Sequence, residues 1–234
     1  MQLFYNPNIT KIDTAFVFDK DESRHIVKVL RKQIGDKLVI TNGKGYLFYT
    51  EVTVSDIKRC EVKVLSHEFK ERRPFRLHIA IAPTKMNDRY EWFLEKATEI
   101  GIEEITPIFC DHSERKVIKP ERMEKILQSA MKQSLHCYLP KLNPSVSFDD
   151  FITSNFKGHR FIAHCEESHK IALKTALKKK SDCLILIGPE GDFSVKEIET
   201  AKEHQFIPVT LGNTRLRTET AGIVACHTVA LINE

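Results

Sequence analysis

Two short stretches near the C-terminus decide the fold of this chain: residues 184–193, which read LILIGPEGDF, and residues 209–221, which read VTLGNTRLRTETA. Each begins with an apolar run, breaks at a glycine and continues into a helix-like stretch. Ligands of open α/β sheets bind outside the carboxyl ends of the strands, so two such corners predict a site made of two neighbouring loops. Neither loop contains GxGxxG or GxxxxGK[ST], so a dinucleotide or a nucleoside triphosphate is not favoured.

From residue 76 onward the sequence alternates between short apolar runs and stretches with helical periodicity. We expect strands at 77–82, 105–109, 161–163, 184–187 and 208–211, and helices at 88–100, 121–135, 197–204 and 219–232. In the first helix the apolar residues share one face, and Gly101 follows as a C-terminal stop. This rhythm predicts an α/β domain with a largely parallel sheet.

The first 70 or so residues read differently, as several short β-rich runs with one helix near 22–30. The turn Asn42-Gly43-Lys44-Gly45 lies between two of these runs and is a strong hairpin signal. Such a pattern predicts a small closed or half-closed barrel. The charged segment 68–76 contains Pro74 and is the best boundary, which gives domains at 1–72 and 73–234.

Composition narrows the class of protein. Residues 1–75 hold 14 Lys and Arg against 10 Asp and Glu, whereas the rest holds 22 of each, so the whole net charge of +4 belongs to the first third. A basic surface there fits contact with a phosphate backbone, although an ordinary basic surface also explains it. The six cysteines are scattered without CxxC, which favours reduced thiols. We see no signal peptide or transmembrane run and expect a soluble, intracellular protein.

Four motifs together resemble one family. GPEGDF (188–193) and LGNTRLRTETA (211–221) match its patterns GPEGG-[FL] and LG-x-x-[IVL]-LRTETA, HIVKVLR (25–31) matches H-x-x-x-VLR, and KMNDRYEWFLEKATEIG (85–101) matches K-x-x-[x]-EW-x-x-x-KATELG. The chain therefore resembles the RsmE family of the SPOUT superfamily, which methylates N3 of a uridine in small-subunit ribosomal RNA. Asp192 departs from the family pattern, which has a second glycine there, and adds a carboxylate beside the cofactor that the resemblance implies.

The resemblance implies a fold, partners and a location. It implies an α/β protein with an N-terminal PUA-like RNA-binding β-barrel (1–72) and a C-terminal SPOUT α/β methyltransferase domain with a trefoil knot (73–234). Periodicity alone would give a plain doubly wound sheet, because chains almost never thread loops. The implied partners are 16S ribosomal RNA in the small ribosomal subunit and a second copy of the chain, in the cytoplasm, with no membrane and no metal.

The resemblance also implies the cofactor S-adenosyl-L-methionine. Glycines in the two loops would let the backbone approach the adenosine closely. The implied cofactor-binding residues are His164, Ile187, Gly188, Pro189, Glu190, Gly191, Leu211, Gly212, Leu216, Arg217, Thr218, Thr220 and Ala221.

Methyl transfer to uridine N3 requires positioning and loss of the N3 proton. By resemblance Arg217 and Glu219 border the transfer site, and Glu190, polar within a turn, joins them as a catalytic candidate without being assigned as the base. Thr218 would also serve as N-cap of the last helix. That helix is apolar nearly all round, which fits either a buried core helix or the family's dimer interface.

Contacts with RNA are predicted for six basic residues, although helix-end, linker and ion-pair roles compete for several of them. They are His25, Arg31, Lys32, Arg72, Arg73 and Lys85. The run His164-Cys165-Glu166-Glu167-Ser168-His169 lacks regular zinc spacing, so we expect no metal.

Three alternatives remain open. Another SPOUT enzyme would methylate a ribose 2′-hydroxyl or a different base, and HIVKVLR argues against it. A non-catalytic RNA-binding assembly factor is disfavoured by the intact LRTETA and GPEG loops. A Rossmann-type oxidoreductase is disfavoured by the missing glycine fingerprint.

Overall fold

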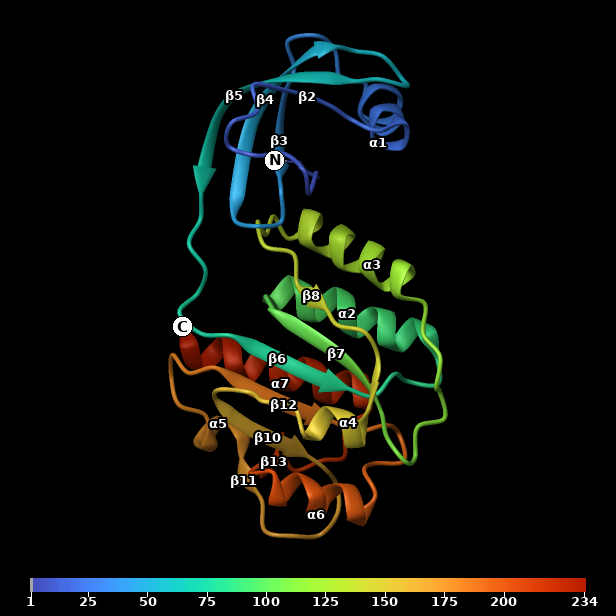
Figure 1. Ribbon diagram of the computed structural model, residues 1–234, viewed down its shortest axis with the longest axis vertical. Coiled ribbons are helices and arrows are strands. Elements are labelled where there is room, and N and C mark those ends of the chain that lie inside the picture. Colours follow the sequence, from blue (N-terminus) through green and yellow to red (C-terminus); the bar gives the residue numbers. More distant parts are fainter. Residues whose placement is uncertain (1) are drawn as a thin grey trace. The chain divides into compact units, whose positions relative to one another are not determined.

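The computed structural model describes residues 2–234, whose contacts divide into two compact units (Figure 1). The first holds the residues up to Arg72 together with Met131–Leu139, and the second holds Arg73–Ala130 and Pro140–Glu234. The predicted domain limits assigned residues 131–139 to the second domain, whereas their contacts group them with the first unit.

The first unit is a mixed five-stranded sheet with order β1-β3-β4-β5-β2. Its strands are β1 (Leu3–Tyr5), β2 (Ala15–Val17), β3 (Lys37–Thr41), β4 (Tyr46–Val54) and β5 (Glu61–Phe69). Antiparallel pairing of β3 with β4 confirms the predicted hairpin at residues 42–45. Among the described residues β1 and β2 end the hydrogen-bonded path, so the barrel is half-closed. Its core includes Phe4, Ile40, Phe48 and Val62.

The predicted helix at 22–30 is two helical segments of different kinds. An α-helix, α1 (Lys20–Arg24), continues directly into a π-helix, η1 (His25–Val29). The side chain of Asp19 caps α1 by accepting a hydrogen bond from the Glu22 amide. Immediately after η1, Arg31 has φ +55°, a left-handed conformation that is uncommon for a residue with a side chain.

Residues 131–139 pack against the hairpin turn of the first unit, a contact that the sequence pattern did not predict. The Leu139 amide donates to the Gly43 carbonyl at 3.0 Å, and the Gly45 amide donates to the Cys137 carbonyl at 2.9 Å. Gly45 has φ +97°, and a Cβ there would overlap the ring of Tyr138. Glycine is therefore required at residue 45 both by the turn and by the segment packed on it.

The second unit is built on an eight-stranded parallel sheet with order β11-β13-β10-β12-β6-β7-β8, in which β9 also pairs with β7. The strands are β6 (Leu77–Ile81), β7 (Glu104–Phe109), β8 (Lys141–Leu142), β9 (Val146–Ser147), β10 (His159–Ala163), β11 (Ile171–Ala172), β12 (Cys183–Ile187) and β13 (Ile207–Thr210). The helices are α2 (Asn87–Ile100), α3 (Pro120–Gln133), α4 (Phe148–Ile152), α5 (Leu173–Ala176), α6 (Val195–Glu203) and α7 (Thr218–Asn233). The parallel α/β prediction is confirmed.

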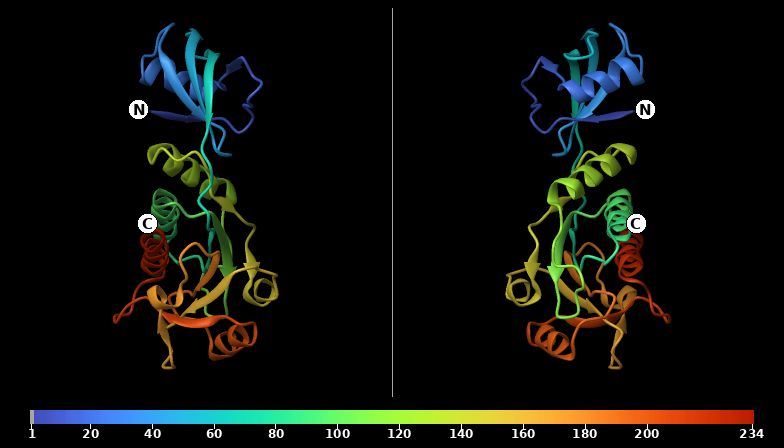
Figure 2. Two further views of the ribbon diagram at one scale, coloured as in Figure 1. Left: turned by 90° about the vertical axis from the view of Figure 1, so that its left-hand side faces the viewer. Right: turned by 90° about the vertical axis from the view of Figure 1, so that its right-hand side faces the viewer.

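Helices cover both faces of this sheet, as Figure 2 shows. Leu184 and Leu186 of β12 face a core that includes Phe148 of α4 and Ile198 of α6. On the opposite face α2 and α7 pack against the sheet and against each other, so closely that a Cβ on Gly222 would meet Phe93. Burial on both faces explains why the central strands are continuous apolar runs.

The ends of the helices follow recognisable signals, with one correction. Gly101 ends α2 with φ +103°, as expected for a left-handed C-terminal glycine. Ser194 and Glu197 form a capping box at the start of α6. The prediction that Thr218 is the N-cap of the last helix is wrong, because α7 begins at Thr218 and Arg217 is the cap residue. The Thr218 hydroxyl instead donates to the Gly188 carbonyl at 3.0 Å.

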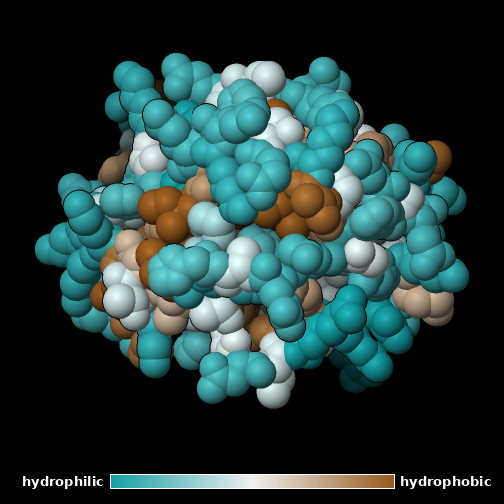
Figure 3. Space-filling view, turned by 90° about the horizontal axis from the view of Figure 1, so that it is seen from below, coloured by the Kyte–Doolittle hydropathy of each residue, from teal (hydrophilic) through white to brown (hydrophobic). Residues whose placement is uncertain are grey.

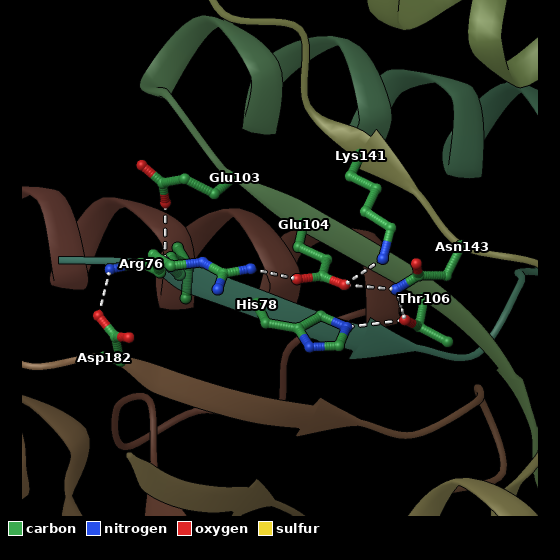
Figure 4. Close-up of polar contacts among 9 residues, drawn as sticks. Arg76, His78, Glu103, Glu104, Thr106, Lys141, Asn143 and Asp182 are labelled. Carbon is green, nitrogen blue, oxygen red and sulfur yellow. Dashed lines mark hydrogen bonds and ion pairs between the residues drawn. The ribbon is translucent and has the colours of Figure 1, made fainter. Parts of the chain in front are cut away.

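A polar network joins β6, β7 and the strand-end residues beside them (Figure 4). Glu104 accepts hydrogen bonds from Arg76 at 2.9 Å, Lys141 at 3.2 Å and Asn143 at 2.8 Å. His78 is only 8% exposed and lies 2.7 Å from the Thr106 hydroxyl, to which the Asn143 amide also donates. Burial lowers the pKa of His78 from 6.5 to about 4, although the Glu104 carboxylate opposes this change.

The surface is mostly polar where Figure 3 shows it. Seen from the α6 end, hydrophilic side chains dominate and the hydrophobic ones form separate areas among them. Among the described residues no helix is both long enough and apolar enough to cross a membrane.

Candidate functional site

The two diagnostic loops meet at the carboxyl edge of the parallel sheet. The first follows β12 and the second connects β13 to α7. The hydrogen bond from Thr218 to the Gly188 carbonyl joins them at one point. Arg215 Nη2 lies 3.5 Å from the Glu190 carbonyl at another. The sequence prediction that these loops lie side by side is therefore confirmed by their contacts.

Two adjoining cavities open between these loops. The larger, of about 300 Å³, is lined by Ala163, Cys165, Ile187, Gly188, Pro189, Glu190, Asp192, Arg215, Leu216, Arg217, Thr218 and Ala221. The smaller, of about 80 Å³, is lined by Ala163, His164, Cys165, Val209, Thr210, Leu211, Gly212, Thr214, Leu216 and Ala221. The larger contains acidic and basic side chains, whereas the smaller is mainly apolar. Ala163, Cys165, Leu216 and Ala221 line both, so a single elongated ligand can occupy the two cavities together.

Most of the predicted cofactor residues line these cavities. They are His164, Ile187, Gly188, Pro189, Glu190, Leu211, Gly212, Leu216, Arg217, Thr218 and Ala221. Gly191 and Thr220 are not among the lining residues. Gly191 instead packs against His112, whose Cβ would lie 3.0 Å from an added Cβ. Thr220 is half-buried in the first turn of α7.

Sequence reasoning missed several lining residues. Arg215 stands inside a diagnostic motif but was not selected, and Ala163 and Cys165 flank the predicted His164. Asp192, noted only as a departure from the family pattern that adds a carboxylate beside the cofactor, also lines the larger cavity. The strand end at residue 163 was the available signal, because side chains there lie at the carboxyl edge.

His164 is a buried lining residue whose ring nitrogens have no hydrogen-bond partner among residues 2–234. The residue is only 8% exposed. Burial lowers its pKa, and Lys170 adds to this effect, so the ring is favoured in the neutral form with one donor and one acceptor. Buried polar groups are nearly always hydrogen-bonded, and because His164 lines the smaller cavity, its ring nitrogens are available to a ligand there.

Hydrogen bonds from other strand-end loops fix the loop after β12. Lys85, which follows β6, donates its amide to Glu190 Oε1 at 2.9 Å. His112, which follows β7, places Nδ1 3.1 Å from the Gly191 carbonyl. Hydrogen bonds within the second unit thus fix the position of this loop.

The three predicted catalytic residues occupy different environments. Arg217 and Glu190 line the larger cavity. Glu219 does not; it is buried in the first turn of α7, with Oε1 3.9 Å from Arg89 Nε. Its second oxygen is buried without a partner in the described part of the chain. Arg89, which was not predicted, therefore belongs to the surroundings of Glu219.

Four of the six predicted RNA-contacting residues lie in the first unit, and three of these belong to the segment 25–32. His25 begins the π-helix, Arg31 is exposed in its left-handed conformation, and Lys32 is half-buried with its amide bonded to the Ile26 carbonyl. Short π-helical turns and strained residues occur frequently at functional sites. In the second unit Lys85 forms an ion pair with Glu114 at 2.7 Å.

The two arginines at the boundary already have partners within their own units. Arg72 lies over the Tyr138 ring, with Cζ 4.4 Å from the centroid. Arg73 donates from Nε to Glu103 at 3.0 Å and stacks on Phe75 at 4.7 Å. These contacts are a sufficient structural explanation for Arg73, which is half-buried, and leave RNA contact as a prediction for both.

Two families match this chain. The RNA methyltransferase domain matches residues 71–230, and the RNA methyltransferase PUA domain matches residues 18–65. A ribosomal RNA small subunit methyltransferase E from Buchnera aphidicola is 32% identical over 90% of this chain and 85% of its own length. The protein of the same name from Bacillus subtilis is 29% identical over 94% of this chain and 91% of its own length.

Solved structures agree in fold. A crystal structure of a probable rRNA-methyltransferase from Porphyromonas gingivalis is 43% identical, covers 99% of both chains and superposes with a TM-score of 0.90. A structure from Legionella pneumophila, described as a methyltransferase in complex with the bound cofactor SAM, is 26% identical with a TM-score of 0.89, covering 99% of this chain and 97% of that one.

Proposed function

Because this chain belongs to the ribosomal RNA small subunit methyltransferase E family, we propose that it transfers a methyl group from S-adenosylmethionine to N3 of a specific uridine in 16S ribosomal RNA. The observation that carries the proposal is the pair of cavities between the GPEGDF and LGNTRLRTETA loops. The family match supplies the reaction, and the cavities supply a place for its cofactor.

The residues present fit this cofactor. The smaller, mainly apolar cavity suits the adenine, and the orphaned ring nitrogens of His164 suit a ligand with several hydrogen-bonding groups. The larger cavity presents both acidic and basic side chains, which suits the zwitterionic aminoacyl end. The residues that would hold the cofactor are the lining residues His164, Ile187, Gly188, Pro189, Leu211, Gly212, Leu216, Thr218 and Ala221, with Gly191 and Thr220 supporting the loops.

S-adenosylmethionine, when bound, supplies an electrophilic methyl group on a sulfonium. The protein must then orient uridine and manage the N3 proton, and orientation alone contributes on the order of 7–11 kcal/mol in the best model reactions. Arg217 lines the larger cavity, where its guanidinium can stabilise negative charge on the uracil as the proton leaves.

Glu190 is better placed than Glu219 to accept that proton. Glu190 lines the cavity, and the hydrogen bond from the Lys85 amide fixes its carboxylate. Glu219 is not among the lining residues of either cavity and lies beside Arg89 in the first turn of α7, where it can orient the start of that helix. A positioned general base contributes roughly two to four orders of magnitude in rate.

The first unit would bind the RNA. Its match to the RNA methyltransferase PUA domain and the basic segment from His25 to Lys32 support this role. The left-handed Arg31 after the π-helix projects from a backbone that is costly to form, which favours a functional reason for its position. Arg72, Arg73 and Lys85 are the additional RNA contacts that we propose. The proposed domain limits remain 1–72 and 73–234.

We propose that the chain acts as a homodimer through the α2–α7 face. Large apolar side chains are exposed on both helices: Trp92 is 43% exposed and Leu231 is 58% exposed. Trp92 is the only tryptophan, so a shift of its emission on dilution, matched to dissociation in sedimentation velocity, is the expected result. A monomer at all concentrations would contradict the dimer.

A trefoil knot and a cytoplasmic location complete the proposal. The knot is supported by the contact between the loop before α7 and the loop after β12, since the family's knot forms where these loops meet. The location follows from the proposed substrate. The proposed chemistry needs no metal, and within residues 2–234 no group of three or more His, Cys, Asp or Glu side chains is placed to hold one.

Cells that lack the gene test the function. We expect their 16S ribosomal RNA to lose 3-methyluridine, detected by mass spectrometry of its nucleosides, and to regain it with the wild-type gene but not with Arg217→Ala. Retention of 3-methyluridine in the deletion strain would refute the assignment. Loss of another methylated nucleoside would move the activity to a different target.

A further inference from the structure

Asp192 is a residue with a side chain where the backbone favours glycine. It lies in the loop after β12 with φ +64°, in the left-handed region. Asp tolerates this conformation better than most residues, yet glycine adopts it without the steric cost. The side chain of Asp192 therefore calls for an explanation other than the turn itself.

The Asp192 carboxylate is fixed in place on the wall of the larger cavity. Its Oδ2 accepts a hydrogen bond from the Cys165 amide at 2.7 Å, which ties the loop after β12 to the loop after β10. His112 Nδ1 lies 3.1 Å from the Asp192 carbonyl and holds the backbone as well. A second carboxylate oxygen remains, for which no hydrogen bond is found among residues 2–234. An ionised carboxylate can accept several hydrogen bonds, so this oxygen is available to a ligand.

The hydrogen bond between the Cys165 amide and Asp192, the tether between the two loops, shows which part of the ligand lies next to the second carboxylate oxygen. Cys165 lines both cavities, whereas Asp192 lines only the larger. The carboxylate thus lies on the larger cavity's side of the shared wall. With the adenine in the smaller cavity and the aminoacyl end in the larger, the group at the shared wall is the ribose. Carboxylates bind ribose hydroxyls in other nucleotide-binding folds because the two hydroxyls donate and the carboxylate only accepts.

We propose that Asp192 recognises the ribose hydroxyls of the methyl donor and makes the site selective for a ribonucleoside. This assignment rests on the proposed function, because it takes S-adenosylmethionine as the ligand. It is separate from the family pattern, in which the second glycine of GPEGG stands at this position.

Competition against tritiated S-adenosylmethionine tests the assignment with two probes, adenosine and 2′,3′-dideoxyadenosine, which differ only in the hydroxyls. Asp192→Asn keeps an acceptor for the Cys165 amide and loses the charge, and Asp192→Gly suits the backbone and loses both. Glu199→Gln is the matched control, because Glu199 lies on α6 outside both cavities and, among residues 2–234, forms an ion pair only with Lys202.

We expect wild type and Glu199→Gln to prefer adenosine by about 10-fold, the size expected for hydrogen bonds to a charged group. Both Asp192 variants should reduce this preference to about 3-fold or less. An unchanged preference in both variants, or none in wild type, would overturn the assignment. Weaker binding of S-adenosylhomocysteine with an unchanged adenosine preference would place Asp192 at the aminoacyl end and also overturn it. Failure of wild type to bind S-adenosylmethionine would instead refute the proposed function.

Discussion

Lowering the pH should destabilise the second unit through His78. In the folded protein its pKa is about 4, against an ordinary value of 6.5, because burial disfavours the charged ring. A histidine whose folded pKa is depressed stabilises the fold fully above pH 6.5, and this contribution is lost as the pH falls from 6.5 toward 4. The folded and unfolded pKa values of His78 differ by about 2.5, and one pKa unit corresponds to about 1.36 kcal/mol. His78 therefore contributes at most about 3 kcal/mol to the free energy of unfolding.

Between pH 7 and pH 5 the same linkage gives a loss of about 2 kcal/mol in the free energy of unfolding. Urea unfolding at the two pH values would measure it for wild type, for His78→Gln and for His169→Gln, an exposed control between β10 and β11. Because other groups titrate too, the quantity to compare is the pH-dependent loss of each variant relative to wild type. We expect His78→Gln alone to lose about 2 kcal/mol less than wild type, and an equal loss in all three proteins would refute the reasoning.

Three further substitutions test other parts of the structure. Gly188→Val should abolish cofactor binding in calorimetry while RNA binding persists, because a Cβ there already lies 3.0 Å from the Phe193 ring; unchanged cofactor affinity would exclude the loop from the site. Arg31→Ala should weaken RNA binding and reduce the salt slope of log K by about 1, with cofactor affinity unaffected; an unaltered slope would remove Arg31 from the RNA contacts. Gly45→Ala should lower the denaturation midpoint in urea, since its Cβ overlaps Tyr138 and the left-handed backbone adds about 1 kcal/mol; wild-type stability would contradict the tight packing there.

The elements of the second unit were predictable because their signals are local. The helix expected at 88–100 is α2 at Asn87–Ile100, and the run expected at 184–187 lies within β12 at Cys183–Ile187. Apolar periodicity and Gly101 set these limits to within a residue. The shortest elements, such as β8 and β11, were missed because two residues carry no periodicity.

Contacts between distant segments could not be predicted. The Thr218 hydroxyl was expected to cap its own helix, but it donates to the carbonyl of Gly188, 30 residues earlier. For Arg73 the sequence left RNA contact and a solvated linker as alternatives, and nothing in the local pattern indicated that its guanidinium pairs with Glu103. In both cases the sequence identified a polar side chain that needs a partner, but the local pattern could not show which distant residue would be that partner.

Those parts of the candidate site that lie in the two sequence motifs were predictable, because each motif identifies a loop. The GPEGDF and LGNTRLRTETA motifs identified most of the lining residues, whereas the tether between Asp192 and Cys165 depends on how β10 and β12 pair in the sheet. Glu219, a motif residue predicted to border the transfer site, is not among the lining residues of the two cavities, and its contact with Arg89 could not be read from the motif.

Purified protein, tritiated S-adenosylmethionine and small ribosomal subunits from cells lacking the gene provide the decisive measurement. After incubation, the RNA is digested to nucleosides and separated by chromatography. We expect the label in 3-methyluridine, and none of it when Arg217→Ala replaces the wild type. Label in a different nucleoside, or no label with subunits and with naked RNA, would contradict the assignment of this protein as a uridine N3 methyltransferase.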